Sequence, residues 1–90
     1  MSDLAPPPEP GAILARLTAL LAEVLHDSPV AAGPATRRED VPGWDSFAQI
    51  NLTIAAEAAF GIRYRLSDLE RFDTLADIAA ATAERLAARR

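Results

Sequence analysis

Apolar residues recur at three- and four-residue spacing in the first part of the chain, and this pattern predicts an amphipathic helix from about Gly11 to His26. The segment before it, residues 1–10, holds four of the seven prolines. We expect that segment to be a flexible tail outside a domain of residues 11–90. The apolar positions of the helix are Ile13, Leu14, Leu17, Leu20, Leu21, Val24 and Leu25.

Residues 27–45 show no sustained periodicity and contain three prolines and two glycines. This predicts a loop much longer than the usual connection in a small domain, and loops of that kind tend to be functional. We expect Val30, Val41 and Trp44 to anchor the loop to the core.

A second helix follows the loop, capped by Asp45 or Ser46 and ended by Gly61. It carries two apolar strips on roughly opposite faces. Either the helix is buried nearly all round, or one strip is a docking surface for another protein. The second interpretation is favoured because that strip begins beside Ser46. The predicted core strip is Leu52, Ala56 and Phe60, with Gln49, and the predicted outward strip is Phe47, Ile50, Ile54 and Ala58.

Two capping-box patterns divide the rest of the chain. Ser67 with Glu70 predicts a short helix that reaches Phe72, and Thr74 with Asp77 predicts the start of a last helix. Its apolar side is Leu75, Ile78, Ala79, Thr82 and Leu86. The predicted fold is all-α, a small four-helix bundle with three longer helices, one short helix and a long loop between the first and second.

The charge balance narrows the possible partners. Nine arginines and no lysine face 13 acidic residues, for a net charge of -4, which argues against binding nucleic acid or an anionic membrane. The absence of cysteine excludes a disulfide framework and a thiolate nucleophile, and we predict no metal site. No signal peptide or membrane-length apolar run is present, so we expect a cytoplasmic protein. We also expect a monomer.

Ser46 has three possible roles. As a nucleophile it needs a general base and an oxyanion hole, and the only histidine, His26, ends the first helix with nothing to suggest a proton relay. A small hydrolase is therefore disfavoured, and we predict no catalytic residue. Ser46 could instead cap the helix. As the third possibility, its hydroxyl could be a modification site, because a helix N-terminus favours an attached phosphodiester.

The order of these elements, with GWDSF before the second helix, FGI at its end and FDTLADIA at the start of the last helix, resembles the acyl carrier protein family. The resemblance covers residues 12–88 and includes the related peptidyl carrier domains. It implies that a phosphopantetheinyl transferase attaches 4'-phosphopantetheine from coenzyme A to Ser46, with Asp45 contacting the transferase or its metal. It also implies that residues 46–60 form the partner-recognition helix. The recognition residues would be Asp45, Phe47, Ile50, Asn51, Ile54 and Glu57.

The implied function is to carry an acyl or aminoacyl group as a thioester between ligase and transferase enzymes, in fatty acid or secondary metabolite biosynthesis. Leu52, Ala56, Phe60, Ile62 and Ile78 are the residues that could line an acyl chain. The family's recognition helix is strongly acidic, whereas the outward positions predicted here are Ala48, Asn51, Ala58 and Ala59. We therefore expect a specialised carrier. The alternative is a non-carrier interaction domain that docks through Phe47, Ile50 and Ile54, with Ser46 only a cap.

Overall fold

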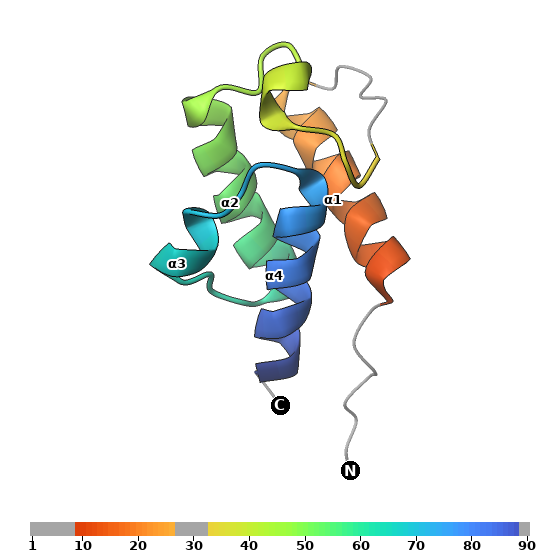
Figure 1. The fold of residues 1–90 in the computed structure, drawn as a ribbon, viewed down its shortest axis with the longest axis vertical. Helices are drawn as coiled ribbons and strands as arrows, with labels where there is room; N and C mark the ends of the chain where they lie inside the picture. Colours follow the sequence, from red (N-terminus) through yellow and green to blue (C-terminus); the bar gives the residue numbers. More distant parts are fainter. Residues whose placement is uncertain (1–8, 27–32, 89–90) are drawn as a thin grey trace.

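The computed structural model describes residues 9–26 and 33–88, and within these ranges its regular structure is helical apart from one isolated bridge between residues 37 and 74. The predicted all-α class, with three longer helices and one short one, is confirmed. The elements are α1 (Pro10–Val24), the 3₁₀-helix η1 (Arg38–Asp40), α2 (Ser46–Phe60), α3 (Leu66–Leu69) and α4 (Leu75–Ala88) (Figure 1).

Helix α1 begins at Pro10, one residue before the predicted domain boundary, and ends at Val24. Proline suits the first helical position because its missing N–H group has no partner there in any helix. The predicted tail otherwise lies outside the described residues. The helix packs against both α2 and α4, and its buried face comprises Ile13, Leu17, Leu20 and Leu21.

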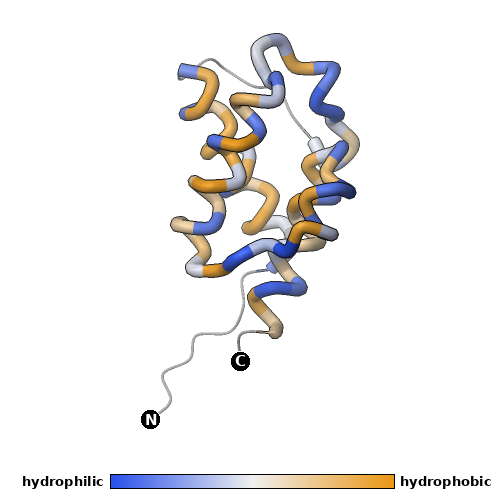
Figure 2. Tube along the Cα trace, turned by 90° about the vertical axis from the view of Figure 1, so that its left-hand side faces the viewer, coloured by the Kyte–Doolittle hydropathy of each residue, from blue (hydrophilic) through white to orange (hydrophobic). Residues whose placement is uncertain are grey.

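The core is formed by the apolar faces of the three longer helices. Apolar residues recur along each of these helices in Figure 2. Leu17, Leu52 and Leu75 come from different helices and are fully buried, and each such side chain stabilises the fold by about 2 kcal/mol. Trp44 is also buried, and Val41 packs against the core, so two of the three predicted loop anchors are confirmed. The third, Val30, lies outside the described residues.

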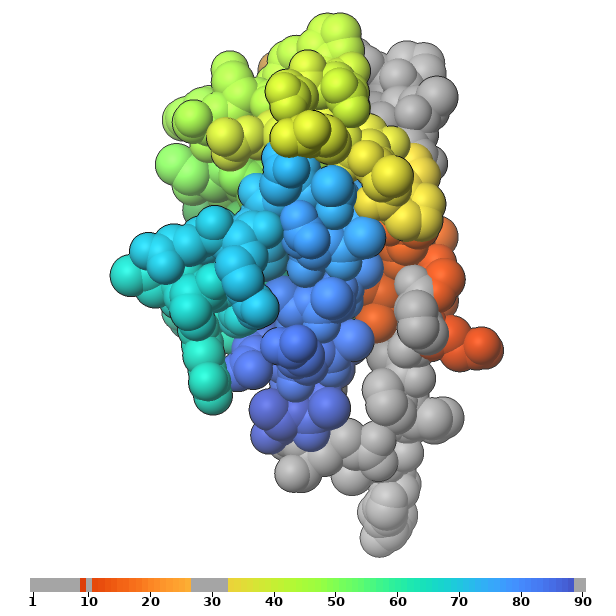
Figure 3. All heavy atoms as spheres, in the orientation of Figure 1, coloured from red at the N-terminus to blue at the C-terminus, as the bar shows by residue number. Residues whose placement is uncertain are grey.

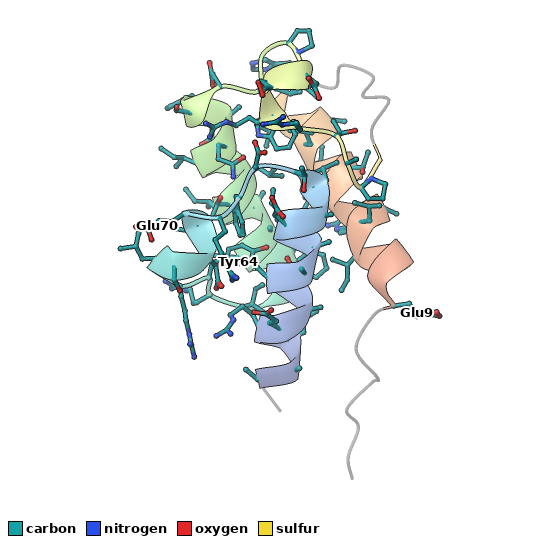
Figure 4. The ribbon with its side chains drawn as sticks, viewed as in Figure 1. Glu9, Tyr64 and Glu70 are labelled. Atoms are coloured by element: carbon teal, nitrogen blue, oxygen red, sulfur yellow. The ribbon has the colours of Figure 1, made fainter. Side chains whose placement is uncertain are left out.

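The short helix α3 is held to α4 by polar contacts as well as by packing. Tyr64 lies between α3 and α4 (Figure 4), where its hydroxyl shares a buried 2.7 Å hydrogen bond with Thr82 Oγ1. Its ring meets Phe72 edge to face, with ring centroids 5.2 Å apart. Burial raises the pKa of the Tyr64 hydroxyl. These contacts fix the segments on either side of α3 relative to α4.

The predicted capping box of Ser67 with Glu70 is wrong. The carboxylate that caps α3 belongs to Asp68, which accepts a 2.9 Å hydrogen bond from the Arg65 N–H. Asp68 is buried and also pairs with Arg71 at 3.2 Å and Arg85 at 3.7 Å. The Arg65 N–H and then the two guanidinium groups hold the pKa of Asp68 below its ordinary value. Asp68 therefore caps α3 while it is buried and paired with two arginines. The sequence spacing alone did not indicate this arrangement.

The loop before α2 covers the beginning of α4, as the yellow segment above the blue helix in Figure 3. The Leu75 and Ala76 N–H groups of α4 donate to the carbonyls of Thr36 and Pro34, at 3.2 and 2.9 Å. The loop also contains η1, which no sequence pattern predicted. The part of the loop before η1 thus provides acceptors for N–H groups at the start of α4, which would otherwise have no partner within the helix.

Candidate functional site

The candidate site is the junction at which the long loop enters α2. Asp45 is the N-cap, and its carboxylate accepts a 2.8 Å hydrogen bond from the Ala48 N–H. Ser46 is the first residue of the helix and is exposed. Among the described residues its hydroxyl has no hydrogen-bond partner. Of the two capping residues that the sequence left open, Asp45 is the cap, and the Ser46 hydroxyl is free for other chemistry.

The residue before the cap fixes this junction. The Trp44 side chain is buried, and its indole Nε1–H donates a 2.7 Å hydrogen bond to Gln49 Oε1 on the second turn of α2. Because Gln49 also lies on α2, this bond orients the end of the loop relative to the helix. The Ser46 hydroxyl is therefore presented from a rigid support.

The outward strip of α2 is exposed. The exposed fractions are 72% for Phe47, 57% for Ile50 and 58% for Ile54. The alternative interpretation, a helix buried nearly all round, is wrong, because only the opposite face packs into the core. Three large apolar side chains thus face solvent directly beside Ser46, which is the pattern of a docking surface.

Helix α3 adds two residues to this surface that the sequence analysis missed. Leu66 and Leu69 are 71% and 39% exposed. Leu69 and two residues of α2, Ile50 and Ile54, line a shallow apolar groove of about 190 Å³. Leu66 and Leu69 share one face of α3 because they are three residues apart, and the sequence gives no signal that this face is exposed. We name Phe47, Ile50, Ile54, Leu66 and Leu69 the apolar surface.

Two residues of α2 differ from the roles predicted for them. Ala48 was predicted to point outward, yet it is buried, because its spacing of four residues from Leu52 and eight from Ala56 puts it on the core face of α2. Glu57 is half-buried, and its carboxylate accepts a 2.9 Å hydrogen bond from the Tyr64 N–H. That bond ties the end of α2 to the segment before α3. Recognition by Glu57, and by the exposed Asn51, stays a prediction.

The residues predicted to line an acyl chain lie in the core. Leu52, Ala56, Ile62 and Ile78 are buried together, and Phe60 packs against them. Their acyl-lining role stays a prediction. Among the described residues, no helix is long and apolar enough to cross a membrane.

No family model matches the chain, and no curated protein matches it significantly. A solved structure does match: the solution NMR structure of the holo acyl carrier protein from Geobacter metallireducens, with a TM-score of 0.77 and 26% sequence identity. The match covers 86% of this chain and 88% of that chain. The chain has the fold of an acyl carrier protein. The predicted bundle type is confirmed by this match, which also supports the predicted resemblance to the acyl carrier protein family.

The likeness to an acyl carrier protein supports a carrier protein rather than a catalyst, in agreement with the prediction from the sequence. The structure supplies a helical bundle, an exposed hydroxyl at the start of α2, and an apolar surface on the same helix and α3.

Proposed function

We propose that this chain is an acyl or aminoacyl carrier whose 4'-phosphopantetheine is attached to Ser46 Oγ. The observation that carries the proposal is the exposed Ser46 hydroxyl, which is without a hydrogen-bond partner among the described residues, at the first position of α2. Asp45 supplies the cap, so modification of Ser46 costs the helix no stabilising bond.

The local electrostatics fit a phosphodiester at this position. The Ser46 and Phe47 N–H groups make no hydrogen bond to any described residue, as expected for the first turn of a helix. Together with the positive end of the α2 dipole they favour a nearby negative charge, by about 0.3–1 kcal/mol at an exposed site. When attached, the group would supply a terminal thiol that holds the cargo as a thioester. The chain itself supplies the tether and so raises the local concentration of cargo at each partner.

We assign partner recognition to the apolar surface together with Asp45 and Asn51. The partners would be a phosphopantetheinyl transferase and the acyl or aminoacyl ligases and transferases that load and unload the arm. The surface presents five exposed apolar side chains. Because its only neighbouring carboxylates on α2 are Asp45, used as a cap, and the half-buried Glu57, we expect partner binding to depend on apolar contact more than on charge. That balance is the basis for assigning a specialised carrier role.

The test is intact-protein mass spectrometry after coexpression with a promiscuous phosphopantetheinyl transferase. We expect the mass to increase by one phosphopantetheine, and Ser46→Ala to abolish the increase. Ser67→Ala is the matched control, because Ser67 is also exposed and lies near the start of a helix. An unchanged mass, with a transferase that modifies another carrier in the same cells, would contradict the proposal.

The exposed apolar surface also supports the second candidate, a non-carrier interaction domain. The two candidates differ at Ser46. In a pull-down from the native source, a non-carrier domain would retain its partners in Ser46→Ala and lose them in Ile54→Arg. A carrier would lose in Ser46→Ala those partners that recognise the loaded arm.

A further inference from the structure

A pocket of about 460 Å³ opens at the same end of the bundle as Ser46. Its walls are the end of α1, residues 42–43 of the loop, and the first turns of α2. Asp45 and Phe47, the neighbours of Ser46 on either side, both line it. A group attached to Ser46 thus leaves the protein at the edge of this pocket.

His26 lines the pocket and has an unusual backbone conformation. Its φ is +63°, in the left-handed region that disfavours residues with a Cβ atom by about 1 kcal/mol. Gly61 has the same conformation after α2, with φ of +67°, and glycine is the usual residue for this role. An imidazole at the end of α1 therefore costs stability that glycine would save. His26 is exposed and lines the pocket, so its imidazole is accessible to a ligand there.

The lining of this pocket matches one part of the arm. Beyond its phosphate, phosphopantetheine has a branched dimethyl group, a hydroxyl and two amides, and this portion carries no charge. His26 and Asn51 offer hydrogen-bond donors and acceptors to the amides and hydroxyl, while Leu25 and Phe47 offer apolar contact to the methyl groups. The phosphate would remain outside the pocket, at the start of α2.

The groove between α2 and α3 fits the arm less well. It has less than half the volume, and its two polar lining residues, Gln49 and Thr53, already hydrogen-bond within the protein. The rest of its lining is Ile50, Ile54 and Leu69. A buried amide without a partner costs about 1–3 kcal/mol. The groove therefore suits apolar contact with a partner, and the pocket beside His26 suits the polar arm.

We propose that the pantetheine portion of the unloaded arm rests in this pocket, hydrogen-bonded to His26 and Asn51. The proposal depends on the proposed attachment at Ser46. The pocket would shield the thiol from solvent until a partner displaces the arm. His26 and Asn51 act here as positioning residues.

The test compares the protein before and after enzymatic attachment of the arm, with attachment verified by intact mass. We expect amide NMR shifts to change at Leu25, His26 and Asn51. In His26→Gly, which suits the left-handed backbone, and in Asn51→Ala, these changes should disappear. The thiol should then react about threefold faster with an aromatic disulfide reagent, if the arm is docked about two thirds of the time. Thr53→Ala, in the other groove, is the control and should leave shifts and rate unchanged.

The possible failures are distinguishable. If no arm is attached, the mass overturns the proposed function and this proposal with it. If the arm is attached but the shift changes fall at Ile50, Thr53 and Leu69, the arm rests in the other groove. If attachment changes no amide shifts in the unaltered protein, and the thiol reacts at the same rate in His26→Gly, the arm has no resting site. Either of the last two results overturns this proposal alone.

Discussion

The two helices that follow loops, α2 and α4, begin in very different ways. At the start of α4, the Asp77 carboxylate accepts hydrogen bonds from the Asp73 and Thr74 N–H groups at 3.0 and 2.9 Å, and Thr74 Oγ1 accepts from the Asp77 N–H at 3.1 Å. Loop carbonyls accept from the next N–H groups. At the start of α2, the only side-chain cap among the described residues is the hydrogen bond that the Ala48 N–H donates to the Asp45 carboxylate.

The start of α4 is capped and covered, whereas the start of α2 is exposed. The beginning of α4 is covered by the loop, and an ion pair of Arg37 with Asp73 at 3.2 Å closes it further. The beginning of α2 leaves Ser46 exposed with unpaired N–H groups around it. A protein that only needed to fold would gain by capping both starts fully. The open start is therefore the position at which to expect chemistry.

The largest effect is expected from Asp77→Ala, which removes two accepted hydrogen bonds from the closed start. We expect the free energy of unfolding to fall by about 2 kcal/mol in urea titrations. Glu84→Ala is the matched control, since Glu84 is an exposed carboxylate on the same helix, and should change stability by less than about 0.5 kcal/mol. Equal effects of the two substitutions would show that the closed start contributes no special stability.

Acid should destabilise the protein by protonating Asp77, at the start of α4, and Asp68, in α3. The Thr74 and Asp73 N–H groups hold the pKa of Asp77 below its ordinary value, and the Arg65 N–H and two arginines do the same for Asp68. A carboxylate whose pKa is lowered by folding stabilises the protein above its ordinary pKa, and this is lost as pH falls through the folded value. Urea titrations from about pH 7 to about pH 2 should show that loss. It should be smaller in Asp77→Asn, and an identical pH profile in that variant would contradict the assignment.

A smaller effect is expected from Asp45→Ala at the open start. One hydrogen bond, to the Ala48 N–H, is lost, and stability should fall by about 1 kcal/mol. Asp45→Asn keeps a good cap and should restore most of that stability. If Asp45→Ala destabilised the fold as much as Asp77→Ala, the contrast between the two helix starts would fail.

The smallest effect is expected from Ser46→Ala in the unmodified protein. Its hydroxyl has no described partner, and alanine favours helix, so stability should change by less than about 0.5 kcal/mol. The measurement is urea denaturation of protein produced without a transferase. A loss of about 1 kcal/mol would instead indicate the capping role that the sequence left open.

Much of the fold could be predicted because helical periodicity and caps are local signals. The Thr74 and Asp77 box and the stop at Gly61 were predicted from a few neighbouring residues, and the structure confirms both. The capping residue of α3 was missed because Asp68 is selected by burial against Arg85, a residue distant in sequence. Such long-range pairing leaves no trace in local spacing.

The site was predictable in part for the same reason. The exposure of Phe47, Ile50 and Ile54 followed from two apolar strips on one helix, of which the core could take only one. Leu66 and Leu69 join that surface through the placement of α3, which depends on the contact of Tyr64 with Thr82. The pocket beside His26 forms where three segments meet, so no single stretch of sequence indicates it.

Trp44 is the chain's single tryptophan, and it lies buried directly before the Asp45 cap with its indole bonded to Gln49. Its emission therefore gives a label-free optical signal from the junction that presents Ser46. Under the proposed function, the arm would be attached and a partner would dock within a few residues of this one fluorophore, so both steps would be open to stopped-flow measurement on the unaltered protein.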